Sequence, residues 1–212
     1  MDKTLAEILG LLCAEGNYRE FYANYKEYDK RRGKFYYRKN KRQRIMEFSN
    51  KDIKLIHHFI KLLNLKFGYF PNINKTSNEL FRVFITKWDI IDNLLSYTKI
   101  GCNKWIIHED IINGNKSIKK AFIRGFFFGD GCLDKTSDGC LRIRFSSVNL
   151  KGMLLLSKIL IDLSIYNNLN GPYIRKKRKP IFEILVKRES NQRFINCILN
   201  DSFAGKKAFM PG

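Results

Sequence analysis

The chain has 212 residues, is 44% hydrophobic, and carries 40 Lys and Arg against 20 Asp and Glu, a formal net charge of +20. This apolar content allows a packed core and excludes a disordered chain, and the length suits one or two domains. The charge favours a polyanionic partner, and we expect nucleic acid. We expect no membrane association, because no apolar run is long enough to span a bilayer and no basic amphipathic helix stands out.

The periodicity of the apolar residues predicts an α+β fold of two pseudo-symmetric halves, each ordered αββαββα. The first half is expected to contain helix 2–16, two long strands within 17–49 around a turn at 31–33, helix 50–63, strands 66–73 and 80–86, and helix 88–97. The second is expected to contain helix 118–129 after an N-cap at Ser117, strands 131–136 and 140–147, helix 149–164, strands 170–177 and 181–187, and helix 189–199. The predicted domains are 1–98, a connector 99–116, a second half 117–200 and a tail 201–212.

The five cysteines form no CxxC pair, and the three histidines form no metal-ligand pair at helical spacing. These patterns argue against a zinc site and indicate reduced thiols. Charged residues interrupt the apolar N-terminus, which argues against a signal peptide. We therefore expect an intracellular protein, in an organelle or in archaeal or bacterial cytoplasm.

One short motif occurs twice, at residues 8–16 and again at residues 123–131. Each copy reads as an apolar helix containing a glycine, a small residue four positions later, an acid and a final glycine. Small residues one turn apart let two helices approach closely, so the two helices are expected to pack together. That packing would bring the carboxylates of Glu15 and Asp130 into proximity at the helix ends.

Two carboxylates at close range are unfavourable unless a proton or a metal ion lies between them. Mg²⁺ prefers oxygen ligands and bridges to phosphate, so the pair is typical of phosphodiester chemistry. The alternative is that Glu15 and Asp130 are surface acids that end structural helices. Gly16 and Gly131 are interpreted as left-handed helix caps.

Both motifs resemble the LAGLIDADG motif, and over about residues 2–200 the chain resembles a monomeric, two-motif LAGLIDADG homing endonuclease. The resemblance implies that the motif helices form the interface between the halves. It also implies two saddle-shaped antiparallel β-sheets along the major groove of double-stranded DNA, and cleavage across the minor groove that leaves 3′ overhangs. Glu15 and Asp130 would be the catalytic acids and would hold Mg²⁺, or Mn²⁺ or Ca²⁺, together with Ala14 and Gly129.

The family also places basic and polar residues just past the second strand of each half, where they stabilise transition-state charge. In this chain those positions hold Asn50 and Lys51 in the first half, so both are assigned catalytic roles. An ordinary helix start capped by Asn50 is the alternative. In the second half Val148 stands at the lysine position, a departure from the family pattern. Either Lys151 or Arg144 replaces the lysine, or one DNA strand is cut more slowly.

Basic and aromatic residues are interleaved along 17–49, and Arg142 and Arg144 alternate with apolar residues in the second half. Successive strand residues alternate between faces, so one face of each sheet is expected to be cationic and to point outward, with Arg42 and Arg44 on that face in the first half. The run at 175–179 is interpreted as a DNA-backbone contact, with a nuclear localisation signal or a solvated hairpin tip as alternatives. The residues assigned to DNA binding are Arg19, Tyr25, Lys34, Tyr36, Arg38, Lys41, Arg42, Arg44, Lys135, Arg142, Arg144, Arg175, Lys177 and Lys179.

The leading hypothesis from the sequence is a site-specific, intron-encoded DNA endonuclease with a long asymmetric target. One alternative is an RNA maturase that binds intron RNA on the same scaffold and needs no nuclease site. Another is a non-catalytic DNA-binding regulator. Substitution of the two acids separates the endonuclease from both alternatives.

Overall fold

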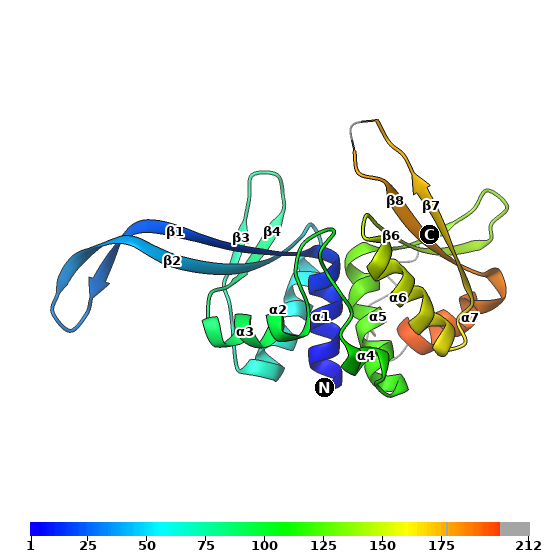
Figure 1. The fold of residues 1–212 in the computed structure, drawn as a ribbon, viewed down its shortest axis with the longest axis horizontal. Helices are drawn as coiled ribbons and strands as arrows, with labels where there is room; N and C mark the ends of the chain where they lie inside the picture. The colour runs from blue at the N-terminus through cyan, green and yellow to red at the C-terminus, as the bar shows by residue number, and fades with distance from the viewer. Residues whose placement is uncertain (177, 200–212) are drawn as a thin grey trace.

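The structure is a computed structural model that describes residues 1–176 and 178–199. It contains two four-stranded antiparallel sheets of the same topology, β1-β2-β4-β3 and β5-β6-β8-β7, with helices against one side of each (Figure 1). The predicted α+β class with two pseudo-symmetric halves is therefore confirmed. Lys177 and the predicted tail 201–212 lie outside the described residues. None of the described helices has the length and apolar character needed to cross a membrane.

The elements follow the same order in both halves. The first half consists of α1 (Lys3–Glu15), β1 (Gly16–Asp29), β2 (Lys34–Asn50), α2 (Ile53–Phe67), β3 (Ile73–Lys75), β4 (Phe81–Ile85) and α3 (Trp88–Tyr97). The second follows a short helix, α4 (Glu109–Ile112), and consists of α5 (Lys116–Asp130), β5 (Gly131–Lys135), β6 (Leu141–Ser147), α6 (Leu150–Asp162), β7 (Asn167–Tyr173), β8 (Ile181–Val186), η1 (Arg188–Ser190), α7 (Asn191–Phe194) and η2 (Ile195–Leu199).

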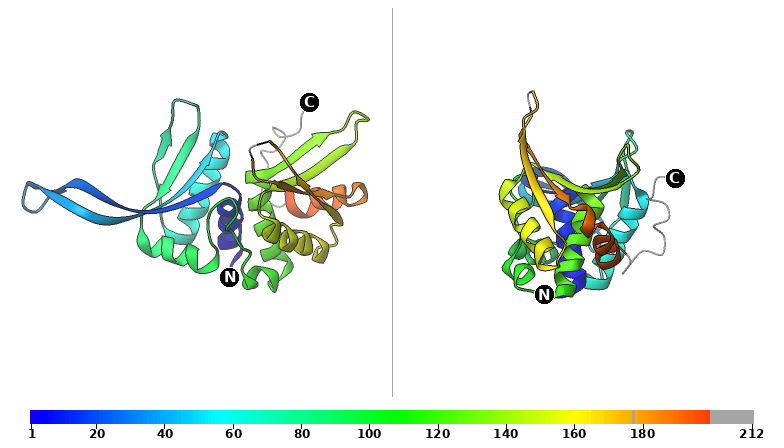
Figure 2. Two further views of the ribbon diagram at one scale, coloured as in Figure 1. Left: turned by 45° about the horizontal axis from the view of Figure 1, so that its top comes forward. Right: turned by 90° about the vertical axis from the view of Figure 1, so that its right-hand side faces the viewer.

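The two motif helices, α1 and α5, lie side by side between the sheets (Figures 1 and 2). Their backbones meet at Gly10 and Gly125. A Cβ atom at Gly10 would overlap the carbonyl oxygen of Phe122, and one at Gly125 would overlap that of Glu7. The glycines are therefore needed for the close approach of the helices, as the repeated motif predicts.

The prediction that Gly16 and Gly131 are left-handed caps is wrong. Both have extended backbones, with φ of −77° and −83°, because each helix passes directly into the first strand of its half. Their N–H groups donate to the carbonyl oxygens of Leu12 and Phe127. A Cβ atom at either glycine would overlap that same carbonyl, so the glycine serves the sharp helix-to-strand transition.

Other predicted boundaries are also corrected. The strand predicted at 66–73 is wrong, because α2 continues to Phe67 and ends at Gly68, which has the left-handed φ of 59° that a helix C-cap favours. The N-cap of α5 is Asn115, not Ser117, since the Asn115 side chain accepts hydrogen bonds from the backbone of residues 117 and 118. The helix predicted at 189–199 is divided into η1, α7 and η2.

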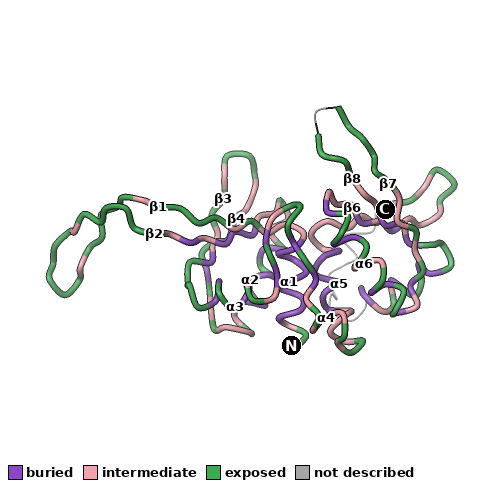
Figure 3. Tube along the Cα trace, viewed as in Figure 1, coloured by how far each residue is buried: buried purple, intermediate pink, exposed green. Residues whose placement is uncertain are grey.

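The helices cover one face of each sheet, and we call the opposite face the open face. On the helix side of the first sheet, Phe48 stacks on Phe59 of α2 with ring centroids 4.3 Å apart. On the helix side of the second, Phe145 packs against Phe127 of α5. Figure 2 shows the sheets above the helices with their hairpins rising on both sides, and Figure 3 shows that the long β1–β2 hairpin is largely exposed.

A buried ion pair joins the halves below the glycine contact. Arg124 of α5 donates from Nη2 to Oε2 of Glu7 on α1 at 2.7 Å and from Nε to Oε1 at 3.1 Å. Nε2 of His58 on α2 lies 2.8 Å from the same Oε1. Burial by itself would raise the pKa of Glu7, but the hydrogen bonds from His58 and Arg124 hold it below its ordinary value. The bidentate geometry fixes the register of the two helices.

Candidate active site

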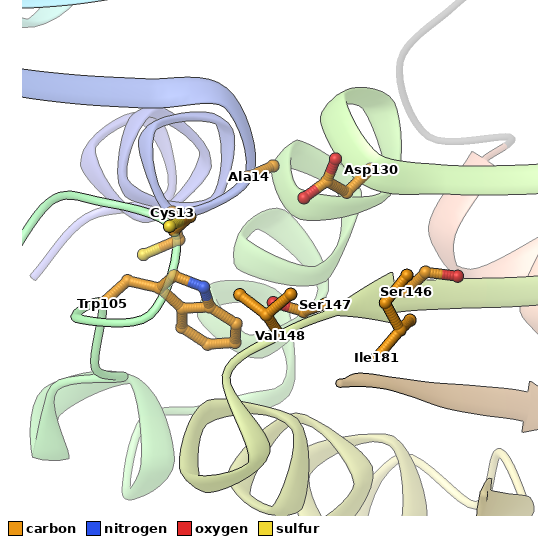
Figure 4. A pocket seen from close by; sticks show the side chains of 9 residues that line it. Cys13, Ala14, Trp105, Asp130, Ser146, Ser147, Val148 and Ile181 are labelled. Atoms are coloured by element: carbon orange, nitrogen blue, oxygen red, sulfur yellow. The ribbon is translucent and has the colours of Figure 1, made fainter. Parts of the chain in front are cut away.

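Glu15 and Asp130 are the last residues of α1 and α5, so the packing of these helices places both acids at one end of the interface. The contact there is close: a Cβ atom added at Gly129 would overlap the side chain of Ala14 and lie 3.1 Å from Cγ of Glu15. Figure 4 shows Asp130 and Ala14 facing one another across the ends of the two helices. The predicted convergence of the two motif acids is thus present in the fold.

The electrostatic environment of the two acids favours their neutral forms. Burial raises the pKa of Glu15 to about 7, although a hydrogen bond from Asn50 partly opposes this effect. Burial, with repulsion from Glu15 second, raises the pKa of Asp130 to about 7. Among the described residues no ion pair involves either acid. The pair is therefore short of positive charge, which a divalent cation would supply.

The residues present fit a hard cation with oxygen ligands. Besides the two carboxylates, the carbonyls of Ala14 and Gly129 lie in the last helical turns. The residues that would be their helical donors, 18 and 133, already belong to β1 and β5. Within the described chain no group of three or more His, Cys, Asp or Glu is placed to hold a metal. A cation here would complete its shell with water and phosphate oxygens, as Mg²⁺ commonly does.

The surroundings of the two acids differ. Nδ2 of Asn50 donates to Oε1 of Glu15 at 3.2 Å, and Lys51 follows as an exposed residue. The matching positions at the end of β6 are Ser147 and Val148. No hydrogen bond from Ser147 or Val148 to Asp130 is found in the described structure.

Beside Asp130 lies a cavity of about 290 Å³. Its lining includes Trp105 of the connector, Val148 and Cys102, and Figure 4 shows Trp105 and Val148 below the acid. Lys179 Nζ is 3.8 Å from Sγ of Cys102, one of the residues that line this cavity.

Arg144 pairs with two other carboxylates in this structure, so its replacement of the missing lysine stays a prediction. Its guanidinium lies between Asp134 and Glu183, at 3.3 and 3.7 Å. Lys151 is exposed in the first turn of α6, so its role stays a prediction.

A single bulge decides which basic residues of the long hairpin share a face. Ala23 pairs with Lys41, but Tyr25 pairs with Arg38, so β2 contains one extra residue at this point. The extra residue is accommodated at Asn40, which has a φ of 49° and donates its N–H to the Asn24 side chain at 2.7 Å. Because of the bulge, even-numbered residues of β2 point to one face before it and to the opposite face after it.

Six of the residues assigned to DNA binding consequently share the open face. They are Arg19, Tyr25, Lys34, Tyr36, Arg38 and Lys41. The expectation that Arg42 and Arg44 lie on the outward cationic face is wrong. Both point to the helix side, where Arg44 is buried and contacts Asp92 of α3 at 2.5 Å. The Trp88 ring of α3 packs against both guanidinium groups.

In the second half, Arg142 and Arg144 alternate with Ile143 and Phe145. Because Ile143 and Phe145 are fully buried on the helix side, the two arginines lie on the open face. Arg142 makes a bidentate pair with Asp134, at 2.9 and 2.8 Å. Lys135 ends β5, and Arg175 and Lys179 lie in the β7–β8 connection. The DNA contacts of all these residues stay predictions.

Two features of the site were missed by sequence reasoning. The first is the buried ion pair between Glu7 and Arg124, whose positions do not correspond in the two motif copies. The second is the set of carboxylates that bind the open-face arginines. Glu47 and Glu183 each stand between two apolar residues in the sequence, and this alternation is the signal that could have found them.

Comparisons with known proteins agree with this geometry. Residues 117–198 match the model of the LAGLIDADG-like domain family, whereas a sequence search of curated proteins finds no match. A structure of mesophilic variants of the homing endonuclease I-DmoI has a TM-score of 0.65 and 19% identity, covering 94% of this chain and 97% of that chain. I-DmoI in complex with DNA and Mn gives a TM-score of 0.64 at 17% identity, covering 95% and 98%.

The N-terminal LAGLIDADG domain of DUF199/WhiA has a TM-score of 0.58 and 13% identity, covering 92% of this chain and 82% of that chain. At these identities the TM-scores establish a shared fold alone, and a fold does not decide chemistry. The resemblance predicted from the two motifs is confirmed.

The raised pKa values of Glu15 and Asp130 predict how stability depends on pH. The folded protein holds these protons more tightly than the unfolded chain between about pH 4 and 7, so this contribution to stability is lost as pH rises through about 7. We expect the free energy of unfolding of Glu15→Gln/Asp130→Asn to exceed that of the wild type by more at pH 8 than at pH 5. Urea unfolding in EDTA measures this difference; equal differences at both pH values would contradict it.

Proposed function

Because residues 117–198 match the model of the LAGLIDADG-like domain family and 94% of the chain is covered by the fold of I-DmoI, we propose that this protein is a site-specific, divalent-metal-dependent endonuclease of double-stranded DNA. The observation that carries the proposal is the meeting of Glu15 and Asp130. One acid comes from each half, and they meet without a cationic partner among the described residues. The chain around them has a net charge of +20.

In this proposal the two acids hold the cation from opposite halves, at the centre of a surface formed by both sheets. The bound cation supplies Lewis-acid activation of water and neutralises charge on the scissile phosphate. Asn50 orients the Glu15 carboxylate through the 3.2 Å hydrogen bond. Lys51 supplies positive charge near the phosphate on the first-half side. Partial burial of the acids limits the access of competing water to the reacting groups.

The open faces provide the DNA-binding surface on both sides of this centre. Each half contributes one sheet, so the chain acts as a monomer and its target contains two half-sites with the cleavage position between them. The halves differ in sequence, so the target is asymmetric. We further propose that the gene lies within an intron, that the product acts inside the cell and that cleavage leaves 3′ overhangs, as the family resemblance implies.

The proposal is tested by selecting cut molecules from a randomised library of double-stranded DNA incubated with the protein and Mg²⁺. The wild type is expected to cut one sequence and leave 3′ overhangs. Glu15→Gln and Asp130→Asn, which keep shape but remove charge, should each slow cleavage of that sequence roughly 100-fold or more. Lys61→Ala, at an exposed position of α2, serves as the matched control and should cut normally.

Two results would contradict the proposal that the protein is an endonuclease. Sequence-specific binding of DNA with no cleavage in Mg²⁺ or Mn²⁺ would indicate a DNA-binding regulator. Tighter binding of structured intron RNA than of any duplex DNA, again without cleavage, would indicate a maturase.

The different surroundings of the two acids predict unequal cleavage of the two strands. Lys51→Met should slow one strand and cause nicked DNA to accumulate, because it removes the positive charge of the first half. Val148→Lys should accelerate the slower strand, since it places an ammonium group beside Asp130. Cleavage of end-labelled DNA in single-turnover reactions measures both rates, with Val148→Met as the size control. Equal effects of Lys51→Met on both strands would oppose this assignment.

A further inference from the structure

The open faces of the two sheets carry a charge pattern that is inverted between the halves. The correspondence follows from strand register, because Gly16 pairs with Phe48 in the first half and Gly131 pairs with Phe145 in the second. Three positions after these glycines stand Arg19 and Asp134. One position before the phenylalanines stand Glu47 and Arg144.

The fourth strands extend the same correspondence. Phe48 pairs with Val83 of β4, and Phe145 pairs with Ile184 of β8. One position before these residues stand Arg82 and Glu183. We call Arg19, Glu47 and Arg82 the first triad, and Asp134, Arg144 and Glu183 the second triad. Every member of one triad has the opposite charge of its counterpart.

The two triads have the same geometry. In the first, Glu47 forms ion pairs with both arginines. Its Oε2 lies 3.2 Å from Nη2 of Arg19, and its Oε1 lies 3.4 Å from Nε of Arg82. In the second, Arg144 lies 3.3 Å from Asp134 and 3.7 Å from Glu183. In both cases the central residue is on the second strand and its partners are one on the first strand and one on the fourth.

The framework around the triads is alike in the two halves, which makes the inversion specific. The second strand has Phe48 and Ser49 in the first half and Phe145 and Ser146 in the second. Phe81 of β4 corresponds in the same way to Phe182 of β8. Charge is therefore reversed on a matching framework, and the second triad has one addition, Arg142, which binds Asp134 and corresponds to Ile45 in the first half.

The triads present different chemistry to a ligand. In the first, the side chain of Glu47 is 9% exposed and pairs with two arginine side chains that are 53% and 38% exposed. In the second, the side chain of Arg144 is 34% exposed and lies between acidic side chains that are 29% and 26% exposed. Nε of Arg82 and Nε of Arg144 are buried and make no hydrogen bond within the described structure.

Nucleic-acid chemistry distinguishes these surfaces. Arginine donates to the O6 and N7 acceptors of guanine, whereas Asp and Glu accept from the N4 amino group of cytosine. Phosphate oxygens would be repelled by the two carboxylates of the second triad, so that triad suits base edges and not the backbone. The first triad therefore offers hydrogen-bond donors to a base. The second offers hydrogen-bond acceptors, one on each side of the Arg144 donor.

We propose that the two triads are specificity determinants that read symmetry-related positions of the DNA target differently. The first triad faces a guanine, and the second faces a cytosine at the matching position of the other half-site. The target is therefore not palindromic at this position. Glu47 acts as a positioning residue for two base-reading arginines. This inference rests on the proposed binding of double-stranded DNA.

The experiment exchanges the charges of the first triad and measures sequence preference. DNA is selected from a randomised library in EDTA, so that bound molecules are not cleaved, by the wild type and by R19D/E47R/R82E. The variant is expected to replace guanine by cytosine at the first-half position, with a change of about 10-fold in the ratio of affinities for the two DNAs. The second half-site should be unchanged, so the selected target becomes more palindromic.

The control for net charge is Lys61→Glu, which also lowers the formal charge by two units but lies on α2, away from the open face. It should weaken binding of all sequences alike without altering the preference. The charge exchange gives the same uniform weakening if the triads do not contact bases, and that outcome overturns the inference.

Two single variants test the same inference in case the triple variant does not fold. Arg19→Gln should relax preference in the first half-site only, and Asp134→Asn in the second only. Unchanged preference in both, with specific DNA binding intact, overturns the inference and leaves the proposed function standing. Absence of any specific binding of duplex DNA by the wild type overturns both.

Discussion

The backbone contact between α1 and α5 is the constraint on which the rest of the structure depends. Gly10 and Gly125 allow the helices to approach so closely that a methyl group at either would overlap the opposite backbone. The pair between Glu7 and Arg124 then fixes how far one helix slides along the other. With distance and register fixed, the helix ends must coincide, and the terminal acids of the two halves meet.

The same constraint determines the electrostatics and the shape of the surface. Each helix passes directly into the first strand of its sheet, so the position of the helices also sets the position of both open faces. The acids are partly buried by this packing, and that burial is the principal reason that the pKa values of Glu15 and Asp130 rise to about 7. The fold thus keeps two acids in an energetically unfavourable environment, at a position where they can bind a cation beside a phosphate.

The sequence was sufficient to predict features that local pattern determines. The repeated motif predicted the central helices, the meeting of the acids and the pseudo-symmetry, because small residues and acids recur at fixed helical positions. It failed where tertiary pairing decides the outcome. The extra residue at Asn40 brings Lys34, Tyr36 and Arg38 onto the open face, opposite to Arg42 and Arg44, and no periodicity of the strand predicts that bulge. The charge inversion of the triads likewise becomes visible only when strand register aligns residues far apart in the chain.

We propose that Glu15 and Asp130, one acid from each half, together form a single divalent-metal site. The most direct test is titration of the protein with Mn²⁺ at pH 8, followed by electron paramagnetic resonance, for the wild type, Glu15→Gln and Asp130→Asn. We predict that the wild type removes Mn²⁺ from the free pool and that either single substitution weakens this binding at least roughly 10-fold, since each removes one charged ligand. Wild-type affinity in both variants would contradict the claim that these carboxylates hold the metal.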